Sequence, residues 1–219
     1  MANKSENTLV HDAIALFIIT LVAGVLLGAV YTITKNPIAK AEEDATNKAY
    51  EAVYKGAEFK SDDALTKSVE SFQKDLTAGK IDDDSFSYTD VTIMEARTAT
   101  ASDGSGYVVK AAAKGYGGNV TIALGISGDG KIMGIQILDA SNETPGLGQN
   151  STKEEWNQQY VGAAADKTLN VVKDGSGSAD NGTINAISGA TITSKAVTRA
   201  VNASLKFVAG QTATGTTAD

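Results

Sequence analysis

The order of hydrophobic and polar positions predicts that the chain begins with helices. Residues 13–33 form an uncharged apolar run, AIALFIITLVAGVLLGAVYTI, with the length of about 20 residues that crosses a bilayer core as a helix. Residues 39–59 are rich in Ala, Glu and Lys and carry apolar residues at helical spacing, which predicts an amphipathic helix started by Pro37. Ser61–Asp63 is expected to cap a further helix that runs to Leu76.

After residue 82 the apolar residues follow the shorter spacing that is typical of β-strands. Four segments are predicted to be strands: residues 86–97, 107–113, 119–126 and 131–138. The Gly-containing segments Asp103–Gly106 and Gly128–Gly130 are typical of hairpin turns, which predicts an antiparallel sheet of at least these strands. A short, mostly apolar run, residues 184–187, precedes a last helix expected over residues 192–208.

These patterns predict an α+β protein with an N-terminal transmembrane helix, followed by a mainly antiparallel sheet packed with helices. Residues 209–219 are small and polar, which is typical of a disordered tail. The expected parts are an N-terminal flank (1–12), the transmembrane helix (13–34), a helical connector (35–82), one globular domain (83–208) and the tail (209–219).

Composition narrows the chemistry that the chain can perform. The 219 residues include no Cys and a single His, His11, which excludes Cys-ligated iron–sulfur clusters, thiolate nucleophiles and multi-His metal sites on this chain. The net charge of -7 argues against nucleic-acid binding, which needs clustered Lys and Arg. Any redox chemistry is therefore expected to use a bound organic cofactor.

The apolar run has two interpretations, an uncleaved membrane anchor and a signal peptide. Ala39-Lys40-Ala41 resembles a cleavage site, but the run is longer than an h-region of about 7–15 residues, and Lys4 is the only fixed cation before it. An uncleaved anchor is therefore expected. Gly24 and Gly28, at Gly-x-x-x-Gly spacing, favour a partner helix in the membrane. Lysines after the run outnumber those before it, so charge alone would place the large domain in the cytoplasm.

The most informative segment is the turn Ser188–Thr191 (the SGAT turn), which lies between the predicted strand and the last helix. A strand that enters a Gly-containing turn and leaves as a helix presents free backbone N–H groups and a positive dipole end, which suits a phosphate. The hydroxyls of this segment, at Ser188, Thr191, Thr193 and Ser194, could donate to that phosphate or carry a covalent group. Taken alone, such a cluster is more often a helix cap worth about 1 kcal/mol.

A second candidate segment is the loop Glu143–Gly148, with the sequence ETPGLG. Pro145 and Gly146 indicate a turn, and glycines let the backbone approach a flat ligand closely. Glu143 and Thr144 would supply polar contacts. Taken alone, the loop is an ordinary surface turn.

Two aromatic residues near these segments are interpreted as structural. Tyr116, in the Gly-Tyr-Gly-Gly segment between two predicted strands, is expected to be a core or sheet-edge residue and is kept out of the primary site. Trp156, the only Trp of the chain, is expected to begin a short helix with Glu154 and Glu155 and to pack into the core.

The SGAT turn resembles the flavinylation motif of the FMN-binding domain family, and ETPGLG is similar to a loop that this family packs against the flavin. The resemblance implies covalent FMN, attached by a flavin transferase to Thr191 through a phosphoester bond. It assigns further FMN contacts to Ser188, Gly189, Ala190, Thr193, Glu143, Thr144, Gly146 and Leu147. The family usually has an Asp six residues before the Thr, where this chain has Asn185.

The same resemblance implies a function. The continuation Ile192–Val197 is similar to the Rnf-type G branch of the family, which implies a single-pass inner-membrane subunit, with its domain on the outer face, that relays electrons within an ion-translocating ferredoxin:NAD+ oxidoreductase. The chain has no Gly-x-Gly-x-x-Gly segment after a strand and hence no nicotinamide site of its own. Its expected partners are the other membrane and soluble subunits of the electron transport complex.

Three alternatives stay open at this point. The first is the equivalent C subunit of the sodium-translocating NADH:quinone reductase. The second is a non-catalytic, membrane-tethered binding or assembly module, in which the SGAT turn is only a helix cap. The third is a secreted carbohydrate- or ion-binding domain, which requires a cleaved N-terminus.

Overall fold

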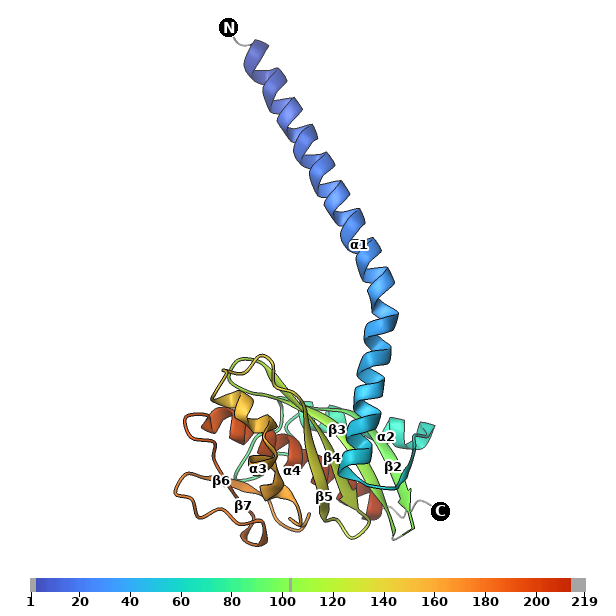
Figure 1. The fold of residues 1–219 in the computed structure, drawn as a ribbon, viewed down its shortest axis with the longest axis vertical. Helices are drawn as coiled ribbons and strands as arrows, with labels where there is room; N and C mark the ends of the chain where they lie inside the picture. The colour runs from blue at the N-terminus through green and yellow to red at the C-terminus, as the bar shows by residue number, and fades with distance from the viewer. Residues whose placement is uncertain (1–2, 103, 214–219) are drawn as a thin grey trace. The chain divides into compact units, whose positions relative to one another are not determined.

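A computed structural model describes residues 3–102 and 104–213, which form two compact units, residues 1–45 and 46–219. The first unit consists of most of helix α1 (Asn3–Val53), and the second contains the sheet and the remaining helices (Figure 1).

Helix α1 is the one helix of the described residues that is long and apolar enough to cross a membrane. The hydroxyls of Thr20, Thr32 and Thr34 donate to carbonyls one turn earlier at 3.0, 2.8 and 2.9 Å, so their polar groups are satisfied within the helix. The expectation that Pro37 starts a new helix is wrong, because Pro37 lies inside α1. A proline removes one backbone hydrogen bond, and the Ala-, Glu- and Lys-rich residues that follow favour continued helix.

The second unit is built on a five-stranded antiparallel sheet with the strand order β1-β2-β3-β4-β5. Its strands are β1 (Glu58–Lys60), β2 (Val91–Ala101), β3 (Gly104–Lys114), β4 (Asn119–Ser127) and β5 (Ile132–Asp139). The predicted α+β class and the four central strands are confirmed, with Asp103 of the β2–β3 turn outside the described residues.

Among the boundaries that differ from the prediction, two have a local cause. The helix expected to reach residue 59 ends at Val53, since Gly56 adopts a left-handed φ of 70° and the chain then turns into β1. Strand β2 begins at Val91 instead of residue 86, because the carboxylates of Asp82 and Asp83 accept the backbone N–H groups of the preceding loop. Such bonds hold a loop conformation that competes with a sheet ladder.

The two faces of the sheet are covered by different helices. One face packs on α2 (Asp63–Thr77), which Asp62 caps as predicted, and on α4 (Thr191–Ala213), and the rings of Phe72 and Phe207 meet there at 5.4 Å (Figure 1). Residues at the alternate strand positions, such as Val108 and Ala123, face Tyr50 of the α1 end in a second, smaller core.

The remaining elements connect the sheet to α4. The predicted short helix is α3 (Glu154–Asn157), flanked by 3-10 turns. Strands β6 (Asn170–Val172) and β7 (Thr183–Asn185) form a small parallel pair. Helix α4 continues to Ala213 through Gly210, five residues past its expected end, so residues 209–213 of the expected tail are helical, and residues 214–219 of that tail lie outside the described residues.

Candidate functional site

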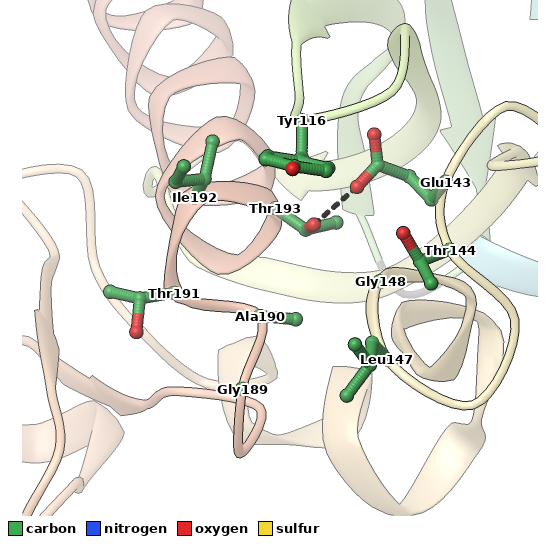
Figure 2. Close-up of a pocket in the computed structure, with 10 residues that line it drawn as sticks. All are labelled: Tyr116, Glu143, Thr144, Leu147, Gly148, Gly189, Ala190, Thr191, Ile192 and Thr193. Atoms are coloured by element: carbon green, nitrogen blue, oxygen red, sulfur yellow. Dashed lines mark hydrogen bonds between the residues drawn. The ribbon is translucent and has the colours of Figure 1, made fainter.

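A pocket of about 590 Å³ opens where three segments of the second unit meet. These segments are the β3–β4 turn (residues 115–118), the loop Glu143–Gly148 and the start of α4 with the SGAT turn (Figure 2). Its volume is that of a typical small-molecule or cofactor site. The lining residues are Tyr116, Glu143, Thr144, Leu147, Gly148, Gly189, Ala190, Thr191, Ile192 and Thr193.

The SGAT turn is held in shape by hydrogen bonds that leave the first N–H groups of α4 free. Gly189 has a left-handed φ of 74°, and Ala190 N–H donates to the carbonyl of Ile187 at 2.9 Å. The hydroxyl of Ser194 accepts Ile187 N–H at 3.0 Å and donates to the carbonyl of Ala190 at 2.9 Å. Ser194 N–H makes the first helical bond, to Ala190 at 3.0 Å.

Helix α4 therefore begins at Thr191, and the N–H groups of residues 191–193 have no preceding helical carbonyl to bond. They lie at the positive end of a 23-residue helix, which favours an anionic group there. Thr191 is half-buried, and Figure 2 shows it on the opposite side of the pocket from Glu143. A hydroxyl thus stands next to the most favourable position for a phosphate.

Glu143 is the one acidic residue among those that line the pocket, and it is buried, with 2% of its surface exposed. Its carboxylate accepts the backbone N–H of Gly117 at 2.8 Å, a longer bond of 3.4 Å from Gly118, and the hydroxyl of Thr193. These donors make up for part of the solvation that the carboxylate loses on burial.

The loop Glu143–Gly148 uses its glycines in two different ways. Gly146 has a left-handed φ of 75° and open space around it, so its role is conformational. Gly148 lies so close to Glu143 and Thr193 that a Cβ there would stand 2.7 Å from the Thr193 hydroxyl. Gly148 therefore allows the loop backbone to approach the side chains of Glu143 and Thr193 closely.

Seven of the nine site residues expected from the sequence line the pocket. The other two do not: Ser188 is exposed outside it, and Gly146 lines a neighbouring surface cavity of about 430 Å³. The structure adds Tyr116, Gly148 and Ile192. The expectation that Tyr116 is a core or sheet-edge residue is wrong, because 70% of its surface is exposed on the pocket wall.

Tyr116 could have been recognised from its setting. Tyr116 lies between glycines in the turn that follows β3. The N–H of Gly115 donates to the carbonyl of Gly118 at 2.7 Å within this turn. An aromatic side chain in such a turn cannot join the sheet face, since its neighbours have left the pleat. Trp156, by contrast, packs against the core as expected, and its indole N–H donates to the carbonyl of Asn185 at 2.7 Å.

Asn185 is bonded on three sides, six residues before Thr191. Its side-chain Oδ1 accepts Gly177 N–H at 2.8 Å, its N–H donates to Gln159 Oε1 at 2.9 Å, and its carbonyl accepts the Trp156 indole. The first of these bonds uses an oxygen that an Asp would also offer. Asn185 therefore keeps the strand before the SGAT turn in place.

Comparisons with known proteins show which domain family and which chains this sequence is similar to. Residues 115–206 match the model of the FMN-binding domain family, which confirms the resemblance seen in the sequence. The G subunit of the Na(+)-translocating ferredoxin:NAD(+) oxidoreductase complex of Acetobacterium woodii is 49% identical over 102 residues, 46% of this chain and 48% of the relative. The G subunit of the proton-translocating complex of Clostridium ljungdahlii is 44% identical over 102 residues, 47% of this chain and 52% of the relative.

The chain spans about half the length of these two curated relatives. The G subunit of an ion-translocating oxidoreductase complex of Methanosarcina acetivorans is 29% identical over 213 residues, 96% of this chain and 99% of the relative. The crystal structure of Shewanella oneidensis NqrC aligns with a TM-score of 0.45 at 23% identity, covering 54% of this chain and 60% of that chain.

Proposed function

We propose that this chain, whose residues 115–206 match the FMN-binding domain family, is a membrane-anchored flavoprotein subunit that carries FMN on Thr191 through a phosphoester bond. One observation carries the proposal: the Thr191 hydroxyl stands at the start of α4, beside N–H groups without helical partners, on the wall of a cofactor-sized pocket. A phosphate at this helix end would meet its natural donors and a hydroxyl to which it can be joined.

The other lining residues fit a flat, partly polar ligand. Tyr116 and Leu147, which are 70% and 40% exposed, offer apolar surfaces to the ring, and Thr144 offers a hydroxyl to its edge or to the ribityl chain. Ser188, exposed next to Gly189, is assigned to the phosphate end of the site. Gly146 acts through the conformation of the loop. Bound FMN supplies the electron transfer, whereas the protein holds the cofactor and excludes water from part of it.

We further infer the setting of this redox group from the relatives. The chain would relay electrons within an ion-translocating ferredoxin:NAD+ oxidoreductase of the Rnf type, together with the other membrane and soluble subunits of that complex. Two relatives named as the G subunit of ferredoxin:NAD(+) oxidoreductase complexes support this proposal. A third, named as the G subunit of an ion-translocating oxidoreductase complex, aligns over nearly its full length. A flavin transferase would attach the cofactor during maturation.

The proposed topology is a single pass through the cell membrane with the domain on the outer face. Residues 13–34 of α1 would span the bilayer, residues 35–82 would form the connector, which also supplies β1 of the sheet, and residues 83–208 would hold the flavin. The apolar surface of α1 and the internally bonded hydroxyls of its threonines support the anchor.

Covalent attachment is tested by the intact mass of the full chain, purified from a host that expresses a flavin transferase. Trypsin releases the site in one peptide, residues 174–195, and we expect a mass increment of FMN minus water on that peptide, localised to Thr191 by fragmentation. Thr191→Val should lose the increment and Thr191→Ser should keep it. Ser176→Ala, a hydroxyl loss in the same peptide but outside the pocket, should keep it as well.

The outcome separates the proposal from a simple helix cap. An unmodified wild-type peptide, with the transferase shown to modify a control substrate, would refute the attachment and favour a tethered binding or assembly module. In that case Thr191→Val would leave cofactor content unchanged. A mature chain that begins after residue 41 would instead indicate a secreted domain.

A further inference from the structure

The carboxylate of Glu143 bonds two segments of the protein to each other. One oxygen accepts the N–H of Gly117 at 2.8 Å, and the other accepts the hydroxyl of Thr193. Gly117 belongs to the β3–β4 turn and Thr193 to the first turn of α4, so the two sides of the pocket are joined through a single buried side chain (Figure 2).

On the basis of the proposed FMN site, we propose that Glu143 is a positioning residue. Its buried carboxylate fixes the β3–β4 turn, which carries Tyr116, at a set distance from the start of α4, which carries Thr191. The bonds therefore determine the width of the pocket in which the flavin is held.

The glycines around Glu143 show how closely this contact is fitted. A Cβ on Gly115 or on Gly148 would run into the carboxylate, and a Cβ on Gly118 would stand 2.6 Å from Cβ of Asn142, the residue before Glu143. Backbone of the β3–β4 turn and of the loop that carries Glu143 thus approaches the carboxylate, with no room for a side chain. The arrangement brings N–H groups within bonding distance of an acceptor that has little access to water.

The β3–β4 turn depends on these bonds for its position. Its largest side chain, Tyr116, is 70% exposed and gains little from burial. Within the turn, Gly115 N–H bonds the Gly118 carbonyl at 2.7 Å, which shapes the turn without attaching it to α4. Because hydrogen bonds to a charged group are stronger than neutral ones, the carboxylate is a strong link between the turn itself and the helix, beside the bond at 2.9 Å that the Arg199 guanidinium of α4 donates to the carbonyl of Lys114, at the end of β3.

The inference is tested by a substitution on one side of the link and a measurement on the other. Thr193→Val removes the donor while keeping the shape of the side chain, and Thr193→Ser keeps the donor. Backbone amide hydrogen exchange is followed by mass spectrometry in the full chain in detergent, without flavin. We expect exchange in residues 115–118 to rise about 10- to 100-fold in Thr193→Val, as for a lost bond to a charged group, and to return to the wild-type rate in Thr193→Ser.

Thr198→Val is the matched control on the same helix. Thr198 is also fully buried, and its hydroxyl bonds the Tyr160 hydroxyl at 2.8 Å, in the core rather than at the pocket. This variant should lower the melting temperature without changing exchange in residues 115–118. Wild-type exchange in that segment in Thr193→Val would refute the link.

A second readout uses the flavinylated protein. With equal mass increments on the 174–195 peptide, Thr193→Val should show lower flavin fluorescence anisotropy and weaker visible circular dichroism than the wild type, because the pocket wall no longer holds its position. Unchanged flavin spectra alongside faster exchange would overturn the positioning of the flavin. A wild-type chain without any mass increment would refute the attachment to Thr191, and the exchange experiment would still decide whether Glu143 joins the two segments.

Discussion

Replacing Gly134 with Ala is expected to strain the junction between the end of α1 and the sheet. Gly134 in β5 lies opposite Gly125 in β4, and Val53 of α1 lies across both. A Cβ on Gly134 would stand 2.8 Å from Cα of Val53 and 2.9 Å from its carbonyl oxygen. Because both are backbone atoms, no side-chain rotation can relieve the contact.

The size of the effect follows from what holds the end of α1. Tyr50, Val53 and Tyr54 are at most 5% exposed, and large buried side chains contribute roughly 1.5–3 kcal/mol each, so undocking would cost roughly 5–9 kcal/mol. Overpacking costs only about 1–3 kcal/mol, so the helix should stay docked under strain. At about 2–4 °C per kcal/mol for a unit of this size, we expect the melting temperature to fall by about 2–12 °C.

The assay is thermal unfolding of the full chain in detergent, followed by far-ultraviolet circular dichroism. Gly210→Ala is the matched control, since Gly210 lies within α4 and nothing within 4 Å would meet its Cβ. That variant should gain up to about 1 kcal/mol from helix propensity. A Gly134→Ala protein that melts as the wild type does would show that Val53 does not press on the sheet as described.

Two further predictions concern the SGAT turn and acid stability. Asn185→Asp keeps the acceptor oxygen for Gly177 N–H, so we expect unchanged melting and a flavin yield, read by intact mass, at least equal to that of the wild type; a lower yield would contradict the described role of this side chain. Burial raises the pKa of Asp83, but hydrogen bonds from the Tyr88 hydroxyl, from two backbone amides and from Lys206 outweigh it and leave the pKa below its ordinary value. A carboxyl whose pKa is lowered on folding stabilises the folded state at pH values above its unfolded pKa of about 3.9, and this stabilisation is lost as the pH falls through the folded pKa. The urea concentration at the midpoint of unfolding should therefore decrease as the pH is lowered below about 4. It should decrease less steeply in Asp83→Asn.

The sequence predicted those elements that depend on local signals. Asp62 caps α2 as expected, accepting Leu65 N–H at 2.6 Å, and the Gly-containing turn at residues 128–130 joins two strands. These features depend on residues that are close together in the chain, so the sequence alone is sufficient to predict them. The same holds for the SGAT turn, in which Gly189 adopts the left-handed conformation that a glycine permits.

Elements that depend on distant partners were missed. Strand β1 has three residues and exists because β2 offers it an edge. Strand β6 pairs across a loop of ten residues, 173–182, with β7, which overlaps the strand expected at residues 184–187. Tyr116 was judged by its residue type, whereas its exposure follows from the way the Glu143 carboxylate holds its turn. No periodicity in the sequence reports that a carboxylate will meet backbone N–H groups of the β3–β4 turn and a hydroxyl of α4.

The indole bond of Trp156 has a practical consequence. As the only Trp of the chain, it emits the whole of the indole fluorescence, and its N–H is bonded to the carbonyl of Asn185, on the strand that leads to Thr191. A flavin absorbs at the wavelengths that indole emits, so resonance energy transfer would quench this emission when the pocket fills. With FMN on Thr191 as proposed, Trp156 would therefore report optically on flavin attachment. Since the chain has no Cys, a single introduced thiol would give a second, uniquely labelled position for distance measurements.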